Sequence, residues 1–124
     1  MDSLKTIEKD DPLRDKSYKF AIRVVNLASY LQKEKKEFVL SKQILRSGTA
    51  IRALIHEAKF GQSRADFTSK MNIALKEANE TEYWLRLLKD TDFISKTQFD
   101  SLRPECNELI AMLVSTVKTS RLEK

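Results

Sequence analysis

The sequence predicts an all-α protein, an antiparallel up-down-up-down four-helix bundle. Glycine and proline together supply only 4 of the 124 residues, 2 of each, which is far below average usage and suits long helices. Apolar residues recur at spacings of three and four in four separate stretches, and helix-capping residues stand before three of them. We expect residues 12–121 to form the bundle domain. Residues 1–11 are mostly charged and aperiodic, and they are predicted to be a flexible N-terminal tail.

The first predicted helix begins at Asp11-Pro12, an N-cap followed by proline at the first helical position, and ends near residue 34. The second runs from about Ser41 to Phe60, with Gly61 expected to supply a left-handed C-cap. Gly48 stands in mid-helix, where glycine costs about 1 kcal/mol relative to alanine. We expect a close approach to another helix at this position to be the compensation.

The third predicted helix begins after Ser63, which forms a capping box with Asp66, and reaches about Leu88. One face should be core, with the following apolar residues: Phe67, Met71, Ala74, Leu75, Ala78, Leu85 and Leu88. Roughly opposite lies a second apolar seam of Ile73, Trp84 and Leu87, with Glu77 and Glu80 between them. This seam is predicted to be a contact between subunits, the alternative being that its side chains flank a thick internal core.

The fourth predicted helix begins at a second capping box, Ser95 with Gln98, and continues to about Ser120. Its apolar face includes Cys106, which we interpret as a small buried hydrophobic residue. As Cys106 is the only cysteine, no internal disulfide can form, and a reducing cytoplasm is the expected location. The longest aliphatic run, residues 110–114, is far shorter than a membrane span of about 20 residues, so we expect no membrane segment.

A basic sector on the second helix is the leading candidate for a nucleic-acid-binding surface. The formal net charge is +5 and the pI is near 9.4, which moderately favours polyanionic partners. One sector of roughly 140° on this helix gathers basic side chains. Its members are Lys42, Arg46, Arg52, His56 and Lys59. The functional interpretation is a surface that follows phosphates. The alternative is a solvated helix face, or a face whose Arg46 pairs with a carboxylate of the third helix.

Catalytic and metal-binding constellations are missing from the sequence. His56 is the only histidine, so the paired Glu-x-x-His motifs of di-iron bundles and a tetrahedral Cys/His zinc site are both excluded. There is no glycine-rich phosphate loop and no nucleophile with a plausible base. The prediction is a protein that is not an enzyme and has neither a metal nor another cofactor.

The segments SKQILRSGTAIRALIHEA (41–58) and DFTSKMNIALKEANETEYWLRLL (66–88) resemble the two signature blocks of the four-helix bundle family encoded by intervening sequences in 23S rRNA genes. The resemblance covers about a third of the chain, and the sequence departs from the family pattern at Arg52 and Leu54. It implies a closed homopentameric ring with no established enzymatic activity. The family is also similar in fold to the accessory variability protein of diversity-generating retroelements, a basic pentamer that binds nucleic acid and a reverse transcriptase.

Two hypotheses about function follow. The first is an oligomeric, non-enzymatic bundle whose basic surface binds RNA, DNA or a nucleic-acid-handling protein. The second is a structural or protein-interaction bundle with no nucleic-acid role.

Overall fold

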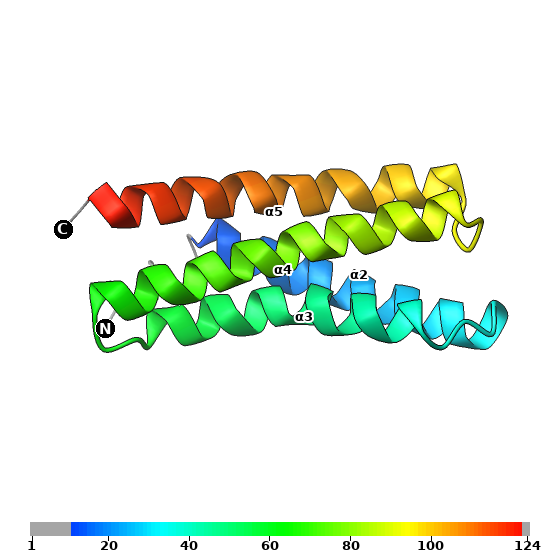
Figure 1. Cartoon of the computed structure of the whole chain (residues 1–124), viewed down its shortest axis with the longest axis horizontal. Helices are drawn as coiled ribbons and strands as arrows, with labels where there is room; N and C mark the ends of the chain where they lie inside the picture. The colour runs from blue at the N-terminus through cyan, green and yellow to red at the C-terminus, as the bar shows by residue number, and fades with distance from the viewer. Residues whose placement is uncertain (1–10, 123–124) are drawn as a thin grey trace.

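The computed structural model describes residues 11–122, which form four helices and no strand (Figure 1). The helices are α2 (Pro12–Glu34), α3 (Leu40–Lys59), α4 (Arg64–Asp90) and α5 (Lys96–Leu122). The all-α class and all four predicted helices are confirmed, with boundaries within about two residues of those expected. The predicted N-terminal tail lies outside the described residues, except for Asp11.

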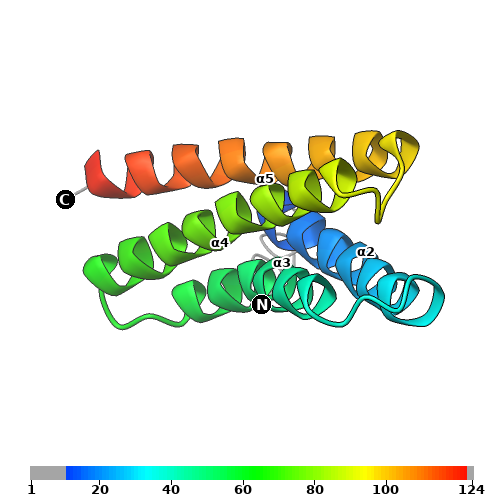
Figure 2. The same cartoon turned by 45° about the vertical axis from the view of Figure 1, so that its right-hand side comes forward.

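The four helices pack side by side, and each contacts two others (Figures 1 and 2). Within the described chain, α3 lies between α2 and α4, and α5 contacts α4 and α2. Thus α2 and α4 are diagonal to each other, as are α3 and α5. The α2–α3 and α4–α5 links lie at one end of the molecule and the α3–α4 link lies at the other (Figure 1).

Local capping signals place the starts of three helices as the sequence predicted. The Asp11 carboxylate accepts a hydrogen bond from the Arg14 N–H at 3.0 Å, with Pro12 in the first turn of α2. Ser63 Oγ accepts from the Asp66 N–H at 3.1 Å at the start of α4. The capping box before α5 is reciprocal: the Gln98 N–H donates to Ser95 Oγ at 3.1 Å, and the Ser95 N–H donates to Gln98 Oε1 at 2.7 Å. These bonds satisfy N–H groups that have no partner inside the helix.

The expected left-handed glycine C-cap at Gly61 is wrong. Neither glycine of the chain has a positive φ, and α3 ends on Phe60 with φ of −105°. A Cβ atom at Gly61 would lie 3.1 Å from Asp66 Cβ and 3.2 Å from the Ala58 carbonyl oxygen. A small residue therefore fits here because the first turn of α4 packs closely against the end of α3. The positive φ values belong instead to Lys36 (54°) and Asp92 (65°), in the two links at the other end.

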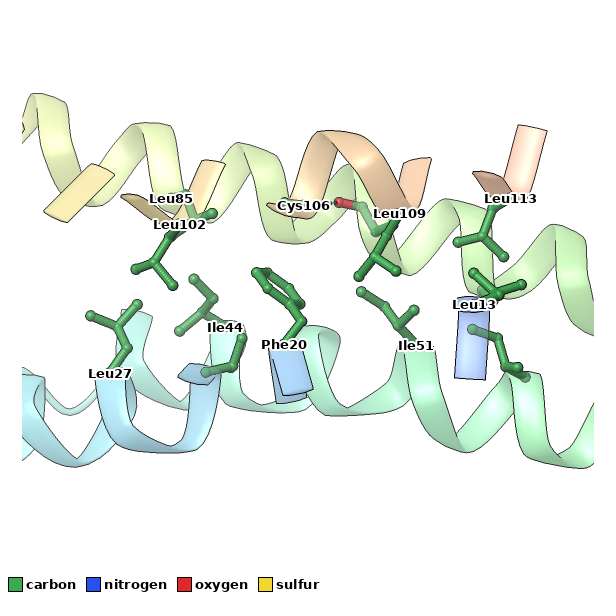
Figure 3. Packing of buried hydrophobic residues seen from close by; sticks show 14 of the residues in the cluster. Leu13, Phe20, Leu27, Ile44, Ile51, Leu85, Leu102, Cys106, Leu109 and Leu113 are labelled. Atoms are coloured by element: carbon green, nitrogen blue, oxygen red, sulfur yellow. Dashed lines mark hydrogen bonds between the residues drawn. The ribbon is translucent and has the colours of Figure 1, made fainter. Parts of the chain in front are cut away.

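The core is a single cluster to which all four helices contribute. Figure 3 shows Phe20, Ile44 and Ile51 pointing from one side of the core toward Leu85 and Leu109 on the other. The α4 core face is confirmed: five of its predicted residues are buried, and Phe67 and Leu75 are partly buried against the cluster.

A few hydroxyl groups are buried between the helices. Thr81 Oγ1 of α4 lies 2.8 Å from Ser47 Oγ of α3 and 2.8 Å from the carbonyl oxygen of Glu77. The Thr68 and Ser120 hydroxyls are hydrogen-bonded to each other between α4 and α5. Each buried hydroxyl of these two pairs therefore has a partner, as burial of a polar group requires.

Candidate nucleic-acid interface and subunit contacts

Two residues of the basic sector of α3 form ion pairs within the chain, one with α4 and one at the start of α2. Arg46 reaches toward α4, where Nη1 donates to Glu77 Oε2 at 3.1 Å and Nη2 donates to Glu80 Oε1 at 3.0 Å. The hydrogen bond to Glu77 is the main cause of a raised pKa at Arg46, to which Glu80 also contributes. The pairing of Arg46 with carboxylates of the third helix, one of the two alternatives considered above, is therefore present within one chain.

The other four predicted basic residues have different environments. Lys59 Nζ forms an ion pair with Asp11 at the start of α2. Lys42 is exposed and forms no ion pair with any residue in 11–122. Arg52 is half-buried, and its Nε atom is shielded from solvent with no hydrogen-bond partner among the described residues. The exposed His56 ring lies 5.0 Å from the ring of Phe60, measured between centroids.

A cluster of lysines at the α2–α3 end of the bundle was missed by the sequence analysis. We call it the end cluster, and its members are Lys33, Lys35, Lys36 and Lys42. All four are exposed, and within the part of the chain that the structure describes none of them forms an ion pair. Three of these lysines belong to the segment QKEKKE (32–37), which was interpreted only as the end of the first helical pattern. The end cluster is not paired with α4 carboxylates, unlike Arg46.

Glu37 adds no exposed negative charge to the end cluster because its side chain turns inward. Its Oε1 accepts a hydrogen bond from the Ser41 N–H at 2.7 Å, and its Oε2 accepts from the Leu40 N–H at 2.9 Å and the Val39 N–H at 3.2 Å. Burial alone would raise the pKa of Glu37, but these N–H donors and the Ser41 side chain outweigh it and lower the pKa. Glu37 therefore caps α3 as a carboxylate, and Glu34 is the only exposed acid in the link region 33–42.

The structure separates the members of the predicted α4 seam. Ile73 is 41% exposed and Leu87 is half-buried. Trp84 packs partly against the core of its own chain, with its Nε1 shielded and without an acceptor among the described residues. Glu77 and Glu80 bind Arg46, and Glu77 Oε1 is shielded with no partner in residues 11–122. The seam is therefore neither fully inside the bundle nor fully in water, and its role as a subunit contact stays a prediction.

A second apolar surface lies on α2, and the sequence analysis did not identify it. Tyr18, Ile22 and Val25 are 59%, 46% and 48% exposed, respectively. Their i, i+4, i+7 spacing places them along one side of the helix, and we call them the α2 stripe. They alternate along the sequence with core residues such as Phe20 and Val24 but lie on another side of the helix.

No group of three or more His, Cys, Asp or Glu side chains in residues 11–122 is arranged to hold a metal ion. Nor does this part of the chain include a helix with the length and apolar character needed to cross a membrane.

Cys106 is expected to be unreactive in the folded protein. It is fully buried in α5, where Sγ lies 3.4 Å from the Ala78 carbonyl oxygen. Burial, with a smaller contribution from the Glu82 charge, raises the pKa of Cys106 to about 12. Because the thiolate is the reacting form, we expect iodoacetamide to label the native protein at least ~100-fold more slowly than the urea-unfolded chain at pH 8. Labelling at equal rates would show that the core opens around this residue.

Comparison with known proteins gives a family. The sequence profile of the 23S rRNA-intervening sequence protein family matches residues 9–115. A crystal structure of a protein with unknown function from the S23 ribosomal protein family of Bacteroides thetaiotaomicron VPI-5482 is 56% identical in sequence, with a TM-score of 0.86. The similarity covers 89% of this chain and 98% of that one. None of the curated proteins matches the chain. The chain therefore belongs to the family of 23S rRNA-intervening sequence proteins.

Proposed function

We propose that the protein is a non-enzymatic, cytoplasmic up-down-up-down bundle that assembles into a homopentameric ring and binds RNA or DNA through its basic surface. A nucleic-acid-handling protein is a further candidate partner. The end cluster carries this proposal: four exposed lysines have no ion-pair partner in residues 11–122, while Glu37 in their midst is turned inward. Lysines of this kind displace counterions from phosphates, and the repetition of a modest patch around a ring multiplies its effect.

The ion pairs within the chain also indicate which basic residues belong to the proposed nucleic-acid interface. Arg46 and Lys59 are already neutralised by carboxylates of the same chain, so they contribute less to a positive field than their number suggests. Lys42 connects the end cluster to the outer face of α3, where Arg52 and His56 follow. The proposed interface therefore begins at the α2–α3 end of the bundle and continues along α3.

Titration of labelled RNA and DNA at 50 mM and 200 mM salt tests this proposal. If about four phosphates are contacted, affinity should fall by roughly 100-fold between the two concentrations. A variant with glutamine at all four end-cluster positions should lose most of the low-salt affinity and most of the salt dependence. The matched control replaces four ion-paired lysines with glutamine: Lys16, Lys70, Lys89 and Lys96.

The control variant has the same net charge as the end-cluster variant, so only the position of the lysines differs between them. Equal losses in both variants would mean that affinity follows net charge alone and not the end cluster. Absence of binding at 50 mM salt would favour the alternative, a structural or protein-interaction bundle. The ion pairs of Arg46 and Lys59 are the observation that supports that alternative.

A further inference from the structure

We propose that the end cluster binds single-stranded RNA or DNA and that Phe38 is the residue on which one base of the strand stacks. This inference rests on the nucleic-acid binding proposed above and names the form of nucleic acid that the end cluster takes. It also adds an aromatic side chain with a separate task. The lysines contact phosphates, whereas Phe38 contacts a base.

Phe38 is an exposed aromatic residue in the middle of the lysine-rich α2–α3 link. Its side chain is 51% exposed, and in residues 11–122 its ring makes no contact with another aromatic ring or with a cation. Lys35 and Lys36 precede it in the chain, and Lys42 follows it in the first turn of α3. Phenylalanine is among the residues most often fully buried in folded proteins. The exposed ring is therefore accessible to a ligand that the surrounding lysines attract.

Hydrogen bonds hold the chain on both sides of Phe38. The Glu37 N–H donates to the Leu31 carbonyl oxygen at 3.0 Å, and the Ser41 hydroxyl donates to the Glu37 carbonyl oxygen at 2.8 Å. After Phe38, the Leu40 N–H donates to the Glu37 carboxylate at 2.9 Å. The Glu37 side chain turns inward while the side chain of the next residue is exposed. A ring presented from a fixed backbone loses little conformational entropy when a base stacks on it.

The charge around Phe38 suits a chain of phosphates that passes on either side of a stacked base. The end-cluster lysines are exposed and unpaired within residues 11–122, and the neighbouring Glu37 carboxylate is occupied by N–H groups of α3. Lysine has a flexible four-carbon stem, so its ammonium group can follow an irregular phosphate backbone. Cationic side chains along the backbone together with an aromatic ring under a base are the arrangement by which proteins bind single strands without sequence preference.

An exposed ring favours a single strand over a duplex. Bases with a free face occur in single strands, loops and ends, whereas each base inside a duplex is stacked between its neighbours. A duplex therefore offers phosphates to the lysines but no base to Phe38. Phosphate contacts alone would not distinguish the two forms, because they carry no information about the bases.

A membrane surface is the competing ligand for this link. Val39 is 69% exposed and extends the apolar surface next to Phe38. Binding to a membrane requires a larger apolar surface, such as one face of an amphipathic helix or an acyl chain. Two side chains fall short of that requirement, whereas one ring is sufficient to stack one base. The link therefore fits a nucleic acid better than a lipid surface.

Oligonucleotides with and without bases test the role of Phe38. The probes are fluorescein-labelled oligo(dT) of about 20 nucleotides and an abasic oligomer with the same number of phosphates, each titrated with the full-length protein at low salt. The wild type should bind oligo(dT) more tightly than the abasic oligomer. Phe38→Leu should weaken binding of oligo(dT) at least ~5-fold because stacking is lost. Its affinity for the abasic oligomer should equal that of the wild type, which also shows that the variant is folded.

Two further variants control for the substitution. Phe60→Leu makes the same change at a 74% exposed phenylalanine at the other end of α3, and it should leave both affinities unchanged. Phe38→Trp keeps an aromatic ring and should bind oligo(dT) at least as tightly as the wild type. Since Trp84 is the only native tryptophan, the emission that Phe38→Trp adds to it comes from position 38. Oligo(dT) should quench this added emission, and the abasic oligomer should not.

The remaining outcomes separate the stacking role from nucleic-acid binding itself. Equal affinity of the wild type for both probes, unchanged in Phe38→Leu, would overturn stacking but leave nucleic-acid binding intact. An equal loss of affinity for both probes in Phe38→Leu would overturn stacking as well, because the abasic oligomer has no base to lose. Absence of binding to either probe would reject both proposals. Sedimentation of the protein with phosphatidylserine vesicles in that case would assign the link to a membrane surface instead.

Discussion

Replacement of Gly48 with valine is expected to lower the free energy of unfolding by about 3 kcal/mol and the Tm by roughly 10 °C. Even a Cβ atom at this position would lie 2.7 Å and 2.8 Å from the two methyl carbons of Val24 and 3.1 Å from its Cβ. Val24 is fully buried, and a β-branched side chain in a helix has one strongly preferred rotamer, so it cannot turn away. Urea unfolding followed by circular dichroism measures the loss.

The matched control for this change is Ala53→Val on the exposed face of the same helix. It also introduces valine into α3 but meets no neighbouring helix, so only a loss of about 0.5 kcal/mol from helix propensity is expected. A Gly48→Ala variant should be partly rescued by Val24→Ala, because the second change removes the methyl groups that the new Cβ meets. Equal stability of Gly48→Val and Ala53→Val would contradict the close approach of α2 and α3.

Replacement of Glu37 with alanine is expected to cost about 2–3 kcal/mol of folding free energy. The change removes the side chain that caps α3, because Glu37 accepts from the first N–H groups of the helix and the N-cap residue Val39 makes no side-chain hydrogen bond of its own. It leaves the N–H groups of Val39, Leu40 and Ser41 without their carboxylate acceptor, and Ser41 is fully buried. Hydrogen exchange should report faster opening of the first turn of α3. Glu34→Ala removes an exposed acid from the same region and should leave the folding free energy almost unchanged.

The contribution of Glu37 to the free energy of unfolding should decrease as the pH falls. Its pKa in the folded protein is lowered below the ordinary value of 4.5, so the folded state favours the carboxylate. The stabilisation is therefore fully present above about pH 4.5 and is lost as the pH falls through the lower folded-state pKa. Glu37→Gln has no group to titrate at this position. The difference in stability between the wild type and Glu37→Gln should accordingly shrink between pH 6 and pH 3, and a constant difference would mean that the carboxylate charge contributes nothing.

The start of a helix can be predicted from the sequence where its capping signal is local. Asp11, Ser63 and Ser95 each cap a helix through an N–H a few residues away, so their effect can be inferred without tertiary structure. The cap of α3 is harder to recognise, because Glu37 precedes the helix in an irregular link and acts through an inward turn of its side chain. Gly48 was interpreted correctly as a close approach, whereas Gly61 was not, since its constraint comes from the first turn of α4.

The candidate interface was less predictable for a physical reason. A helical wheel shows which side chains share a sector, but their partners belong to other helices at a height that only packing determines. Arg46 pairs with Glu77 and Glu80, and Lys59 pairs with Asp11, far away in sequence. The end cluster was missed because its lysines belong partly to a link, where helical periodicity gives no information.

The buried hydroxyl pair of Ser47 and Thr81 fixes how far α3 can slide along α4. A displacement of one helical turn, about 5.4 Å, would separate the two oxygen atoms and leave Ser47 Oγ with the longer 3.5 Å hydrogen bond to the Ile44 carbonyl oxygen of its own helix. Alternative alignments of the two helices thus carry a penalty that an all-aliphatic contact would not impose. This buried contact therefore selects one alignment of α3 with α4, and the Arg46 ion pairs to Glu77 and Glu80 favour the same alignment.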